Sequence, residues 1–108
     1  MIDYIRCVRD EGELFVTVNG DAVPLKPSLM VFNHSPSGFE IGYGGSGPAQ
    51  LALAILLMYT DRATAVRLHQ DFKWRFLAKE EYQAVHTGGD VIVIEVDIPK
   101  WIEERKNN

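Results

Sequence analysis

Alternation of hydrophobic and polar residues in the first part of the chain predicts β-strands. Residues 2–9 are rich in β-forming side chains, and residues 14–18 place a leucine and two valines on the same face. The charged sequence Asp10-Glu11-Gly12-Glu13 between them is typical of a turn. We therefore expect the first two strands to form an antiparallel pair.

The dipeptide Asn19-Gly20 follows the second strand and is the strongest short signal for a two-residue hairpin turn. The positive φ angles of such a turn cost glycine nothing and asparagine little. A return strand is therefore expected over residues 22–25, with Pro24 and Pro27 ending it. Together the three strands would form a small antiparallel meander.

The pattern after this meander is mixed. Residues 28–33 are compatible with a strand or with a packed loop, and residues 34–38 have the composition of a turn. Residues 39–43 alternate again, with Phe39, Ile41 and Tyr43 on one face, which predicts a further strand.

The sequence Gly-Gly-Ser-Gly-Pro at residues 44–48 is typical of the start of a helix, because proline lacks the N–H group that would be unpaired there. Ser46 or Gly47 is the expected N-cap. The helix predicted over residues 48–59 is apolar nearly all round, with Gln50 as its only strongly polar side chain. A helix without a polar face is buried on most sides, so this helix is expected at the centre of the fold.

A second helix is predicted over residues 62–71, capped by Thr60-Asp61. Its apolar residues form one stripe, with His69 at the edge. In residues 72–78 aromatic and aliphatic side chains alternate with basic ones, which predicts a half-buried strand.

The last part of the chain completes the prediction. Residues 79–86 are expected to form a loop or a short helical turn, residues 88–90 a turn, residues 91–98 a strand and residues 99–106 a terminal helix. The sequence therefore predicts one α+β domain over residues 1–108, with a mostly antiparallel sheet packed on a buried central helix.

Composition narrows the function classes. The chain has 108 residues and a net charge of -4, without the basic excess of a generic nucleic-acid binder. Cys7 is the only cysteine, which excludes an intramolecular disulfide and favours a reducing, cytoplasmic location. We expect no signal peptide and no membrane association, because the longest apolar run, residues 51–59, is too short to span a bilayer.

The glycine-rich corner before the central helix is the main candidate site. Backbone N–H groups at a helix N-terminus favour an anion, and glycines permit its close approach. Neither named nucleotide-binding fingerprint is present, and glycines that only avoid clashes with a buried helix are the alternative. The candidate ligand contacts in and before this corner are His34, Ser35, Glu40, Tyr43, Gly44, Gly45, Ser46, Gly47 and Gln50.

Other chemistry has weaker support in the sequence. Ser46 lies in a partial G-x-S-x-G nucleophile motif, but the chain lacks the βαβ repeats of an α/β-hydrolase. His34, His69 and His86 have no metal-ligand spacing, so we expect no metal and no cofactor. A basic patch of Arg67, Lys73 and Arg75 beside Trp74 is weighed against an ordinary solvated surface.

The segment from Asn33 to Leu57, N-H-S-P-S-G-F-E-I-G-Y-G-G-S-G-P-A-Q-L-A-L-A-I-L-L, resembles an uncharacterised family of small bacterial, archaeal and phage proteins. The resemblance extends through Asp71-Phe72-Lys73 to Trp101. The family motif commonly has tryptophan at the position of Ile41. The resemblance implies no activity, but it favours a role for the glycine segment beyond a change of chain direction.

A second likeness is to the small viral ring nucleases, which bind cyclic oligonucleotides at a dimer interface. It is carried by an aromatic residue after glycine, then Ser46 and the Ala-Gln-Leu that opens the helix. The nuclease motif has a histidine near the position of Tyr43. The likeness implies phosphate binding, while the absence of this histidine puts phosphodiester cleavage in doubt.

Three functions from different classes remain open. The first is a small binding or regulatory domain, expected to form a homodimer because a second copy could cover part of the apolar helix. The second is a nucleotide- or phosphodiester-binding protein, with a small nuclease-like enzyme as its catalytic form. The third is a purely structural or interaction protein, in which every motif residue serves packing.

Overall fold

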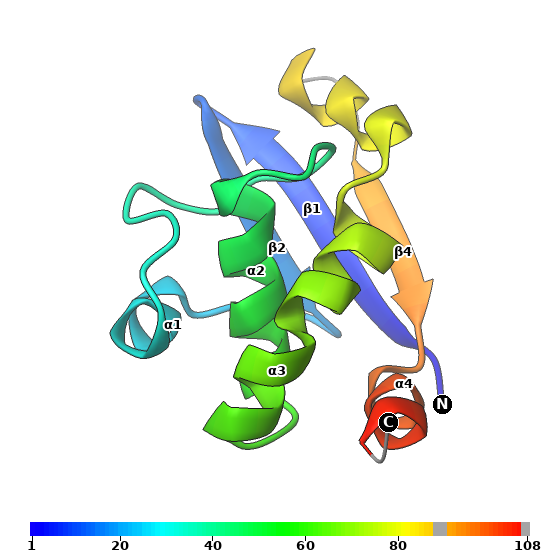
Figure 1. The fold of residues 1–108 in the computed structure, drawn as a ribbon. Helices are drawn as coiled ribbons and strands as arrows, with labels where there is room; N and C mark the ends of the chain where they lie inside the picture. Colours follow the sequence, from blue (N-terminus) through cyan, green and yellow to red (C-terminus); the bar gives the residue numbers. More distant parts are fainter. Residues whose placement is uncertain (88–90, 107–108) are drawn as a thin grey trace.

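The alternating residues of the chain form an antiparallel sheet. The computed structural model describes residues 1–87 and 91–106. Its strands are β1 (Asp3–Asp10), β2 (Glu13–Val18), β3 (Asp21–Ala22) and β4 (Ile92–Val96), in the order β3-β2-β1-β4 (Figure 1). The predicted meander and the late strand are confirmed, although β3 is shorter than the expected return strand. The turn predicted at residues 88–90 lies outside the described residues.

Both hairpins of this sheet turn within two residues of positive φ. The values are 49° at Glu11 and 83° at Gly12 in the first turn, and 52° at Asn19 and 89° at Gly20 in the second. Two consecutive positive φ angles define a type I′ turn, whose twist matches that of the flanking strands. The hairpin predicted from Asn19-Gly20 is therefore confirmed.

Helix α1 (Leu25–Val31) includes residues 28–31 of the segment over residues 28–33 for which the sequence allowed a strand or a packed loop, so that prediction was wrong there. The reason is the position of the two prolines. Pro24 is the N-cap of α1, and Pro27 lies in its first turn, where a missing N–H group costs nothing. Pro24 thus ends β3 by starting a helix.

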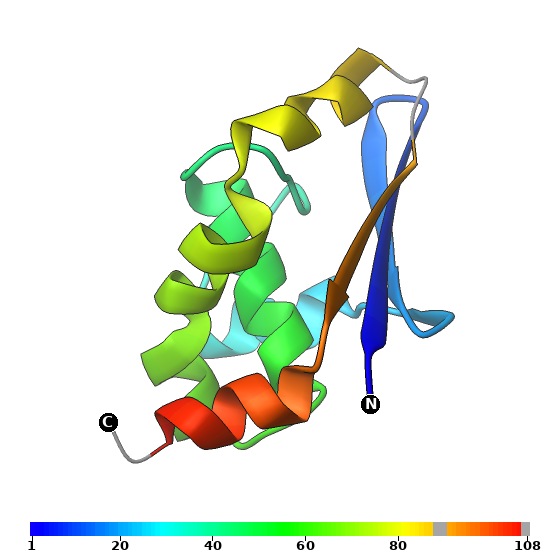
Figure 2. The ribbon, with the colours of Figure 1, turned by 90° about the vertical axis from the view of Figure 1, so that its right-hand side faces the viewer.

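Helix α2 (Ser46–Leu57) is the buried central helix that the sequence predicts. It begins two residues earlier than expected, and its N-cap is Gly45 rather than Ser46 or Gly47. Every residue from Gly47 to Leu56 is buried. Figure 2 shows α2 between the sheet and helix α3 (Arg62–Phe72), and in Figure 1 α1 lies beside it. Because one chain covers α2 completely, its burial is no longer an argument for a second copy.

The strand predicted over residues 72–78 was wrong, because α3 continues directly into η1, a π-helical turn (Lys73–Leu77). A spacing of four residues fits both an alternating strand and one face of a helix. The rings of Phe72 and Phe76, four residues apart, have centroids 4.8 Å apart, and both rings also contact Trp101. Tertiary packing around Trp101 therefore decides this segment.

The strand predicted over residues 39–43 was also wrong. Phe39 and Ile41 are buried as expected, but Tyr43 is 42% exposed. Positive φ angles at Gly38 and Gly42 interrupt the extended conformation. The backbone of Gly42 instead hydrogen-bonds outside any sheet, to Leu77 O and to the side chain of Gln83.

The remaining elements agree with the sequence pattern. A 3-10 helix, η2 (Glu80–Thr87), follows η1, and helix α4 (Ile98–Arg105) follows β4. Asp61 and Asp97 cap α3 and α4 through their side chains. None of the helices in the described ranges is long and apolar enough to cross a membrane.

A buried carboxylate links the sheet to the helices. The Asp3 side chain, on β1, accepts hydrogen bonds from Asn19 Nδ2 (2.8 Å), Tyr59 Oη (3.2 Å) and Ile98 N (3.0 Å). These partners lie in the β2–β3 turn, after α2 and at the start of α4. Asp3 therefore joins three parts of the fold that are distant in sequence.

We expect the substitution Asp3→Ala to lower the free energy of unfolding by about 2–4 kcal/mol, because it leaves the buried N–H group of Ile98 and two partly buried donors without an acceptor. Urea denaturation of the purified protein measures the change. Asp10→Ala, at the exposed other end of β1, is the control and should change stability by less than about 0.5 kcal/mol. Equal losses in both variants would contradict this role of Asp3.

Candidate functional site

Gln50 fixes the segment that precedes the glycine corner. Its Oε1 accepts hydrogen bonds from the backbone N–H groups of His34 (2.7 Å) and Ser35 (3.0 Å). Its Nε2 donates to Ser28 Oγ (2.8 Å) and to Phe32 O (3.1 Å). The side chain is fully buried, and these bonds use both lone pairs and both protons of the amide. Gln50 therefore holds His34 beside α2 and has no hydrogen-bonding capacity left for a ligand.

Two histidines from distant parts of the chain meet beside this segment. His34 Nε2 lies 3.0 Å from His69 Nε2, and the His34 ring stacks on Phe32 with centroids 4.2 Å apart. His69 Nδ1 lies 2.6 Å from the carbonyl oxygen of Val66, which can only accept a hydrogen bond. His69 therefore carries its proton on Nδ1 when neutral, and His34 Nε2 donates to His69 Nε2.

The pKa values of both histidines are shifted toward the neutral form. Burial is the main cause of the lowered pKa of His34, followed by the charges of His69 and Lys73. Burial also lowers the pKa of His69, while its hydrogen bonds to the backbone oppose the shift. A protonated pair would place two like charges at hydrogen-bond distance, so the pair is neutral at pH 7.

Lys73 is the least expected member of this cluster. The residue is 6% exposed, and burial lowers the pKa of its ammonium group. Nζ donates to the carbonyl oxygen of Gly44 (3.1 Å) and lies 4.4 Å from the centre of the Trp74 ring. In the described part of the chain, no carboxylate forms an ion pair with Lys73. A buried cation without a counter-charge is unusual, because burial of a charge is costly unless it is paired.

Each glycine of the corner packs against a side chain. A Cβ atom at Gly44 would overlap the Trp74 ring, and one at Gly45 would overlap the Tyr43 ring. A Cβ atom at Gly47 would overlap the side chain of Glu40. These close approaches explain the glycines by packing, as the structural interpretation of the motif expects.

Glu40 and Tyr43 pack against the glycines of the corner. Arg9 on β1 binds Glu40 with both terminal nitrogens, Nη1 at 2.9 Å from Oε2. Burial and the charge of Glu40 raise the pKa of Tyr43, so its hydroxyl stays protonated. Glu40 therefore carries a compensated charge, whereas Lys73 does not.

The structure brings His34, Ser35 and Gln50 together, and separately Glu40, Tyr43, Gly45 and Gly47. Ser35 Oγ donates to Gly38 O, and Ser46 is exposed at the first position of α2. The ring of His34 hydrogen-bonds to His69. Among the described residues, no three His, Cys, Asp or Glu side chains gather to hold a metal ion. The side chain of His86 lies outside the described ones.

The strand predicted from the sequence placed Lys73 on a solvated or basic face and Trp74 on the apolar face, whereas in the structure Lys73 is buried and Trp74 is exposed. The spacing of His69 and Lys73, four residues apart, was the available signal. On a helix this spacing puts both side chains on one face. The pairing of His34 with His69, 35 residues away, had no signal in the sequence.

A family model matches residues 6–104, almost the whole chain. The chain belongs to a family of unknown function, DUF6166. Neither a curated protein nor a solved structure matches it. In this DUF6166 chain Ile41, which stands where the resemblance expects tryptophan, is fully buried, so this position serves core packing.

We expect Gln50→Leu to lower the free energy of unfolding of this DUF6166 chain by about 3 kcal/mol, because it leaves buried N–H and C=O groups without partners. Urea denaturation measures the loss, and amide hydrogen exchange at His34 and Ser35 should accelerate. Gln70→Leu, at an exposed position of α3, is the matched control. A loss no larger than that of the control would show that these bonds contribute little.

We expect the stability of the protein to fall between about pH 7 and about pH 5 through His34 and His69. Both pKa values are lowered in the folded state, so the unfolded chain binds protons first. The stabilising contribution is thus present above the unfolded pKa of about 6.5 and is lost as the pH falls.

Urea denaturation at several pH values measures this slope. The double variant His34→Gln/His69→Gln should have a shallower slope over the same range, and His86 remains in both proteins. Identical slopes in the two proteins would contradict the shifted pKa values.

Proposed function

We propose that this protein binds a phosphate-bearing ligand at the corner between Gly44 and Lys73. The observation that carries the proposal is the buried ammonium group of Lys73, which has one hydrogen bond to Gly44 O and no ion pair among the described residues. An anion that reaches Nζ would supply the missing counter-charge. In this proposal the protein acts as a binding domain, and its function is to bind this ligand.

The surroundings of Lys73 favour an anion over a neutral ligand. Lys73 Nζ donates its hydrogen bond to the carbonyl oxygen of Gly44, the residue before the Gly45 N-cap, so the charge of Lys73 lies near the positive end of the α2 dipole. Ser46 and Gly47 are the first residues of α2, so their N–H groups have no carbonyl partner within the helix. The positive charge of Lys73 lowers the pKa of His34. An anion that compensates this charge would therefore favour the protonated form of His34.

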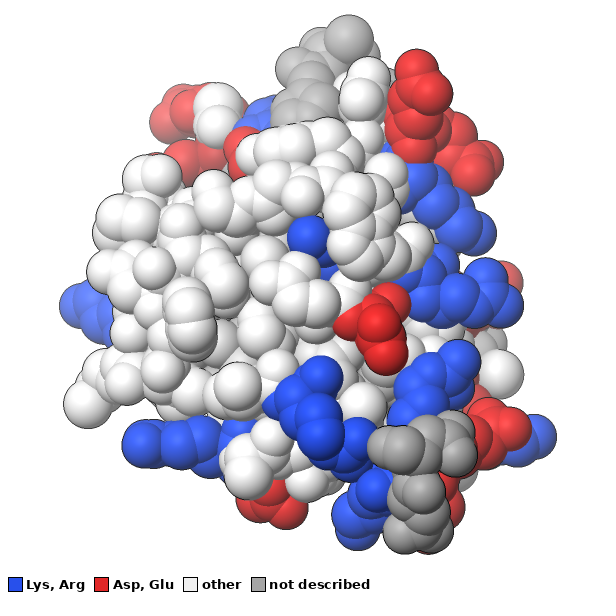
Figure 3. Space-filling view, in the orientation of Figure 1, with Lys and Arg blue, Asp and Glu red and all other residues white. Residues whose placement is uncertain are grey.

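The aromatic side chains nearby favour a nucleotide within this class. Trp74 is 63% exposed, and Nζ of Lys73 lies against its ring. Trp74 also borders a shallow groove of about 380 Å³, together with Asp71, Arg75, Trp101 and Arg105. A base stacked on Trp74 and a phosphate at Lys73 would use both features. Figure 3 shows that the face over α1 and α2 is almost free of charged side chains, which gather at its margins.

Thermal unfolding with inorganic phosphate and with adenosine monophosphate tests the proposal. We expect both to raise Tm, the nucleotide more. At a hundred times its Kd a ligand stabilises by about 2.7 kcal/mol, which corresponds to several degrees for a domain of this size. Lys73→Met should abolish the shift, yet without ligand it should be as stable as the wild type or more stable, because it removes an unpaired buried charge.

Lys100→Met, at an exposed position of α4, is the matched control and should keep the ligand response. Trp74→Leu should keep the response to phosphate and lose the additional effect of the nucleotide. A Tm unchanged by either ligand, together with a destabilised Lys73→Met variant, would make Lys73 a purely structural residue and overturn the proposal.

A further inference from the structure

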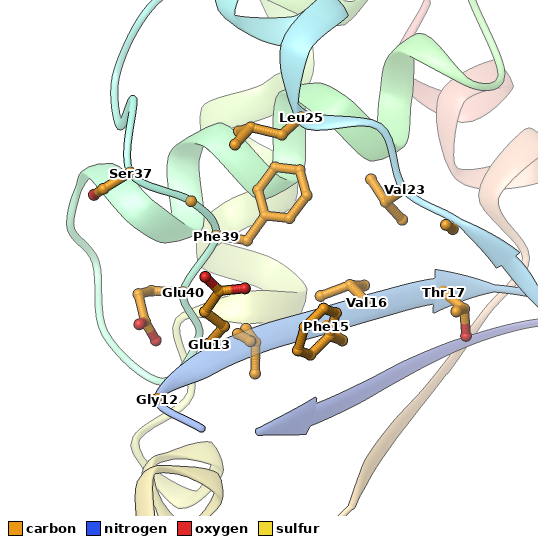
Figure 4. A pocket seen from close by; sticks show the side chains of 13 residues that line it. Gly12, Glu13, Phe15, Val16, Thr17, Val23, Leu25, Ser37, Phe39 and Glu40 are labelled. Carbon is orange, nitrogen blue, oxygen red and sulfur yellow. The ribbon is translucent and has the colours of Figure 1, made fainter. Parts of the chain in front are cut away.

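A cleft of about 380 Å³ lies between strand β2 and the two segments that flank α1, and Lys73 is not among the residues that line it. Strand β2 forms one wall, and Val23, Leu25 and the segment Ser37–Glu40 form the other. Figure 4 shows Phe39, Leu25 and Val23 facing Phe15 and Val16 across this space. Nothing in the proposed function uses the cleft.

The β2 wall presents an open strand edge. β3 pairs with β2 only at Thr17 and Val18, and Val23 N adds one bond to Val16 O. Pro24 then turns the chain into α1, so β3 cannot continue along β2. In the described part of the chain, the edge of β2 before Val16 is therefore without a neighbouring strand.

The hairpin register determines which backbone groups face this edge. Asp10 and Glu13 flank a two-residue turn and form a hydrogen-bonded pair, as do Val8 and Phe15. The N–H and C=O groups of Leu14 and the N–H group of Val16 therefore point away from β1, toward the cleft. The bond from Val23 N to Val16 O confirms this alternation.

We propose that the cleft binds an extended segment of a partner protein, which adds to β2 as an antiparallel or parallel strand. Strand addition would pair the free backbone groups of Leu14 and Val16 with the partner's main chain. The apolar walls formed by Val16, Leu25 and Phe39 would take one of its hydrophobic side chains. This inference is independent of the phosphate site.

The charged residues that line the cleft indicate which kind of partner segment fits it. Among the described residues that line the cleft, Glu13 and Glu40 are the charged ones, and both lie at the end near the β1–β2 turn (Figure 4). Arg9 compensates Glu40. The carboxylate of Glu13 forms no hydrogen bond or ion pair within the described residues. The partner segment is therefore a hydrophobic strand with a lysine or arginine beside it, and not an acidic one.

Amide exchange of the free protein tests the open edge. By NMR, the N–H groups of Leu14 and Val16 should exchange clearly faster than those of Phe15 and Thr17, which bond to β1. Equal protection of all four amides would show that the edge is closed and would overturn the proposal without any ligand.

Peptide titration then tests the occupant. Acetyl-Lys-Thr-Val-Val-Thr-Lys-amide and its variants with each Val replaced by Leu, Ile or Phe should shift and protect the amides of Leu14 and Val16. The same peptides N-methylated at the central residues, and acidic peptides with Glu for Lys, should bind more weakly. The absence of shifts at these amides at millimolar peptide, or peptide-induced association of the protein with itself through β2, would overturn the proposal.

A charge reversal separates this site from unspecific attraction. Glu13→Lys should weaken binding of the basic peptides by about twofold to fivefold, the range of an exposed ion pair, and should favour the acidic ones. Glu11→Lys makes the same change of net charge in the turn, outside the cleft lining, and should leave the affinity unchanged. Equal effects of the two variants would assign the binding to net charge alone and overturn the docking site.

Discussion

Helix α2 has no polar face, and the need to cover it on every side organises the fold. Its residues from Ala49 to Leu56 are at most 2% exposed, so the sheet, α1, α3 and the segment before the helix must all pack against it. The glycines at its start follow from the same constraint, because Trp74, Tyr43 and Glu40 approach the backbone too closely for a Cβ atom. Burial thus determines the position of α2, and the contacts of Trp74, Tyr43 and Glu40 with the glycines determine the path of the chain before it.

This constraint also produces the polar features of the site. Gln50 is the only strongly polar side chain in the middle of an apolar helix, and its burial requires four hydrogen bonds, which draw the segment from Phe32 to Ser35 onto the helix. That placement brings His34 to His69. One turn after His69, where α3 continues into η1, Lys73 donates a hydrogen bond to the carbonyl oxygen of Gly44. Packing therefore converts residues from three separate segments into one neutral histidine pair beside an unpaired cation.

Local signals in the sequence predicted the elements in which one pattern dominates. The meander, the Asn19-Gly20 hairpin, the apolar helix and the Asp61 cap all depend on neighbouring residues. The errors occurred where two periods coincide or where tertiary contacts decide. Phe72 and Phe76 satisfy a strand and a helix alike, and Pro27 was taken as the end of a strand although it lies in the first turn of α1. The glycine motif was found from the sequence, but Lys73 required the correct helix, and the contact of His34 with His69 required the three-dimensional fold.

The π-helical turn after α3 has a consequence for how changes in chain length would act. Ala78 N bonds to Lys73 O, which closes a ring one residue larger than that of an α-helix. This wider turn accommodates one residue more than an α-helical turn does, so removal of one residue from it would leave a regular α-helical turn. In α3 itself the same deletion would turn every following residue by about 100° around the helix axis. The π-helical turn is therefore the position of this helix at which the loss of one residue changes the direction of the neighbouring side chains least.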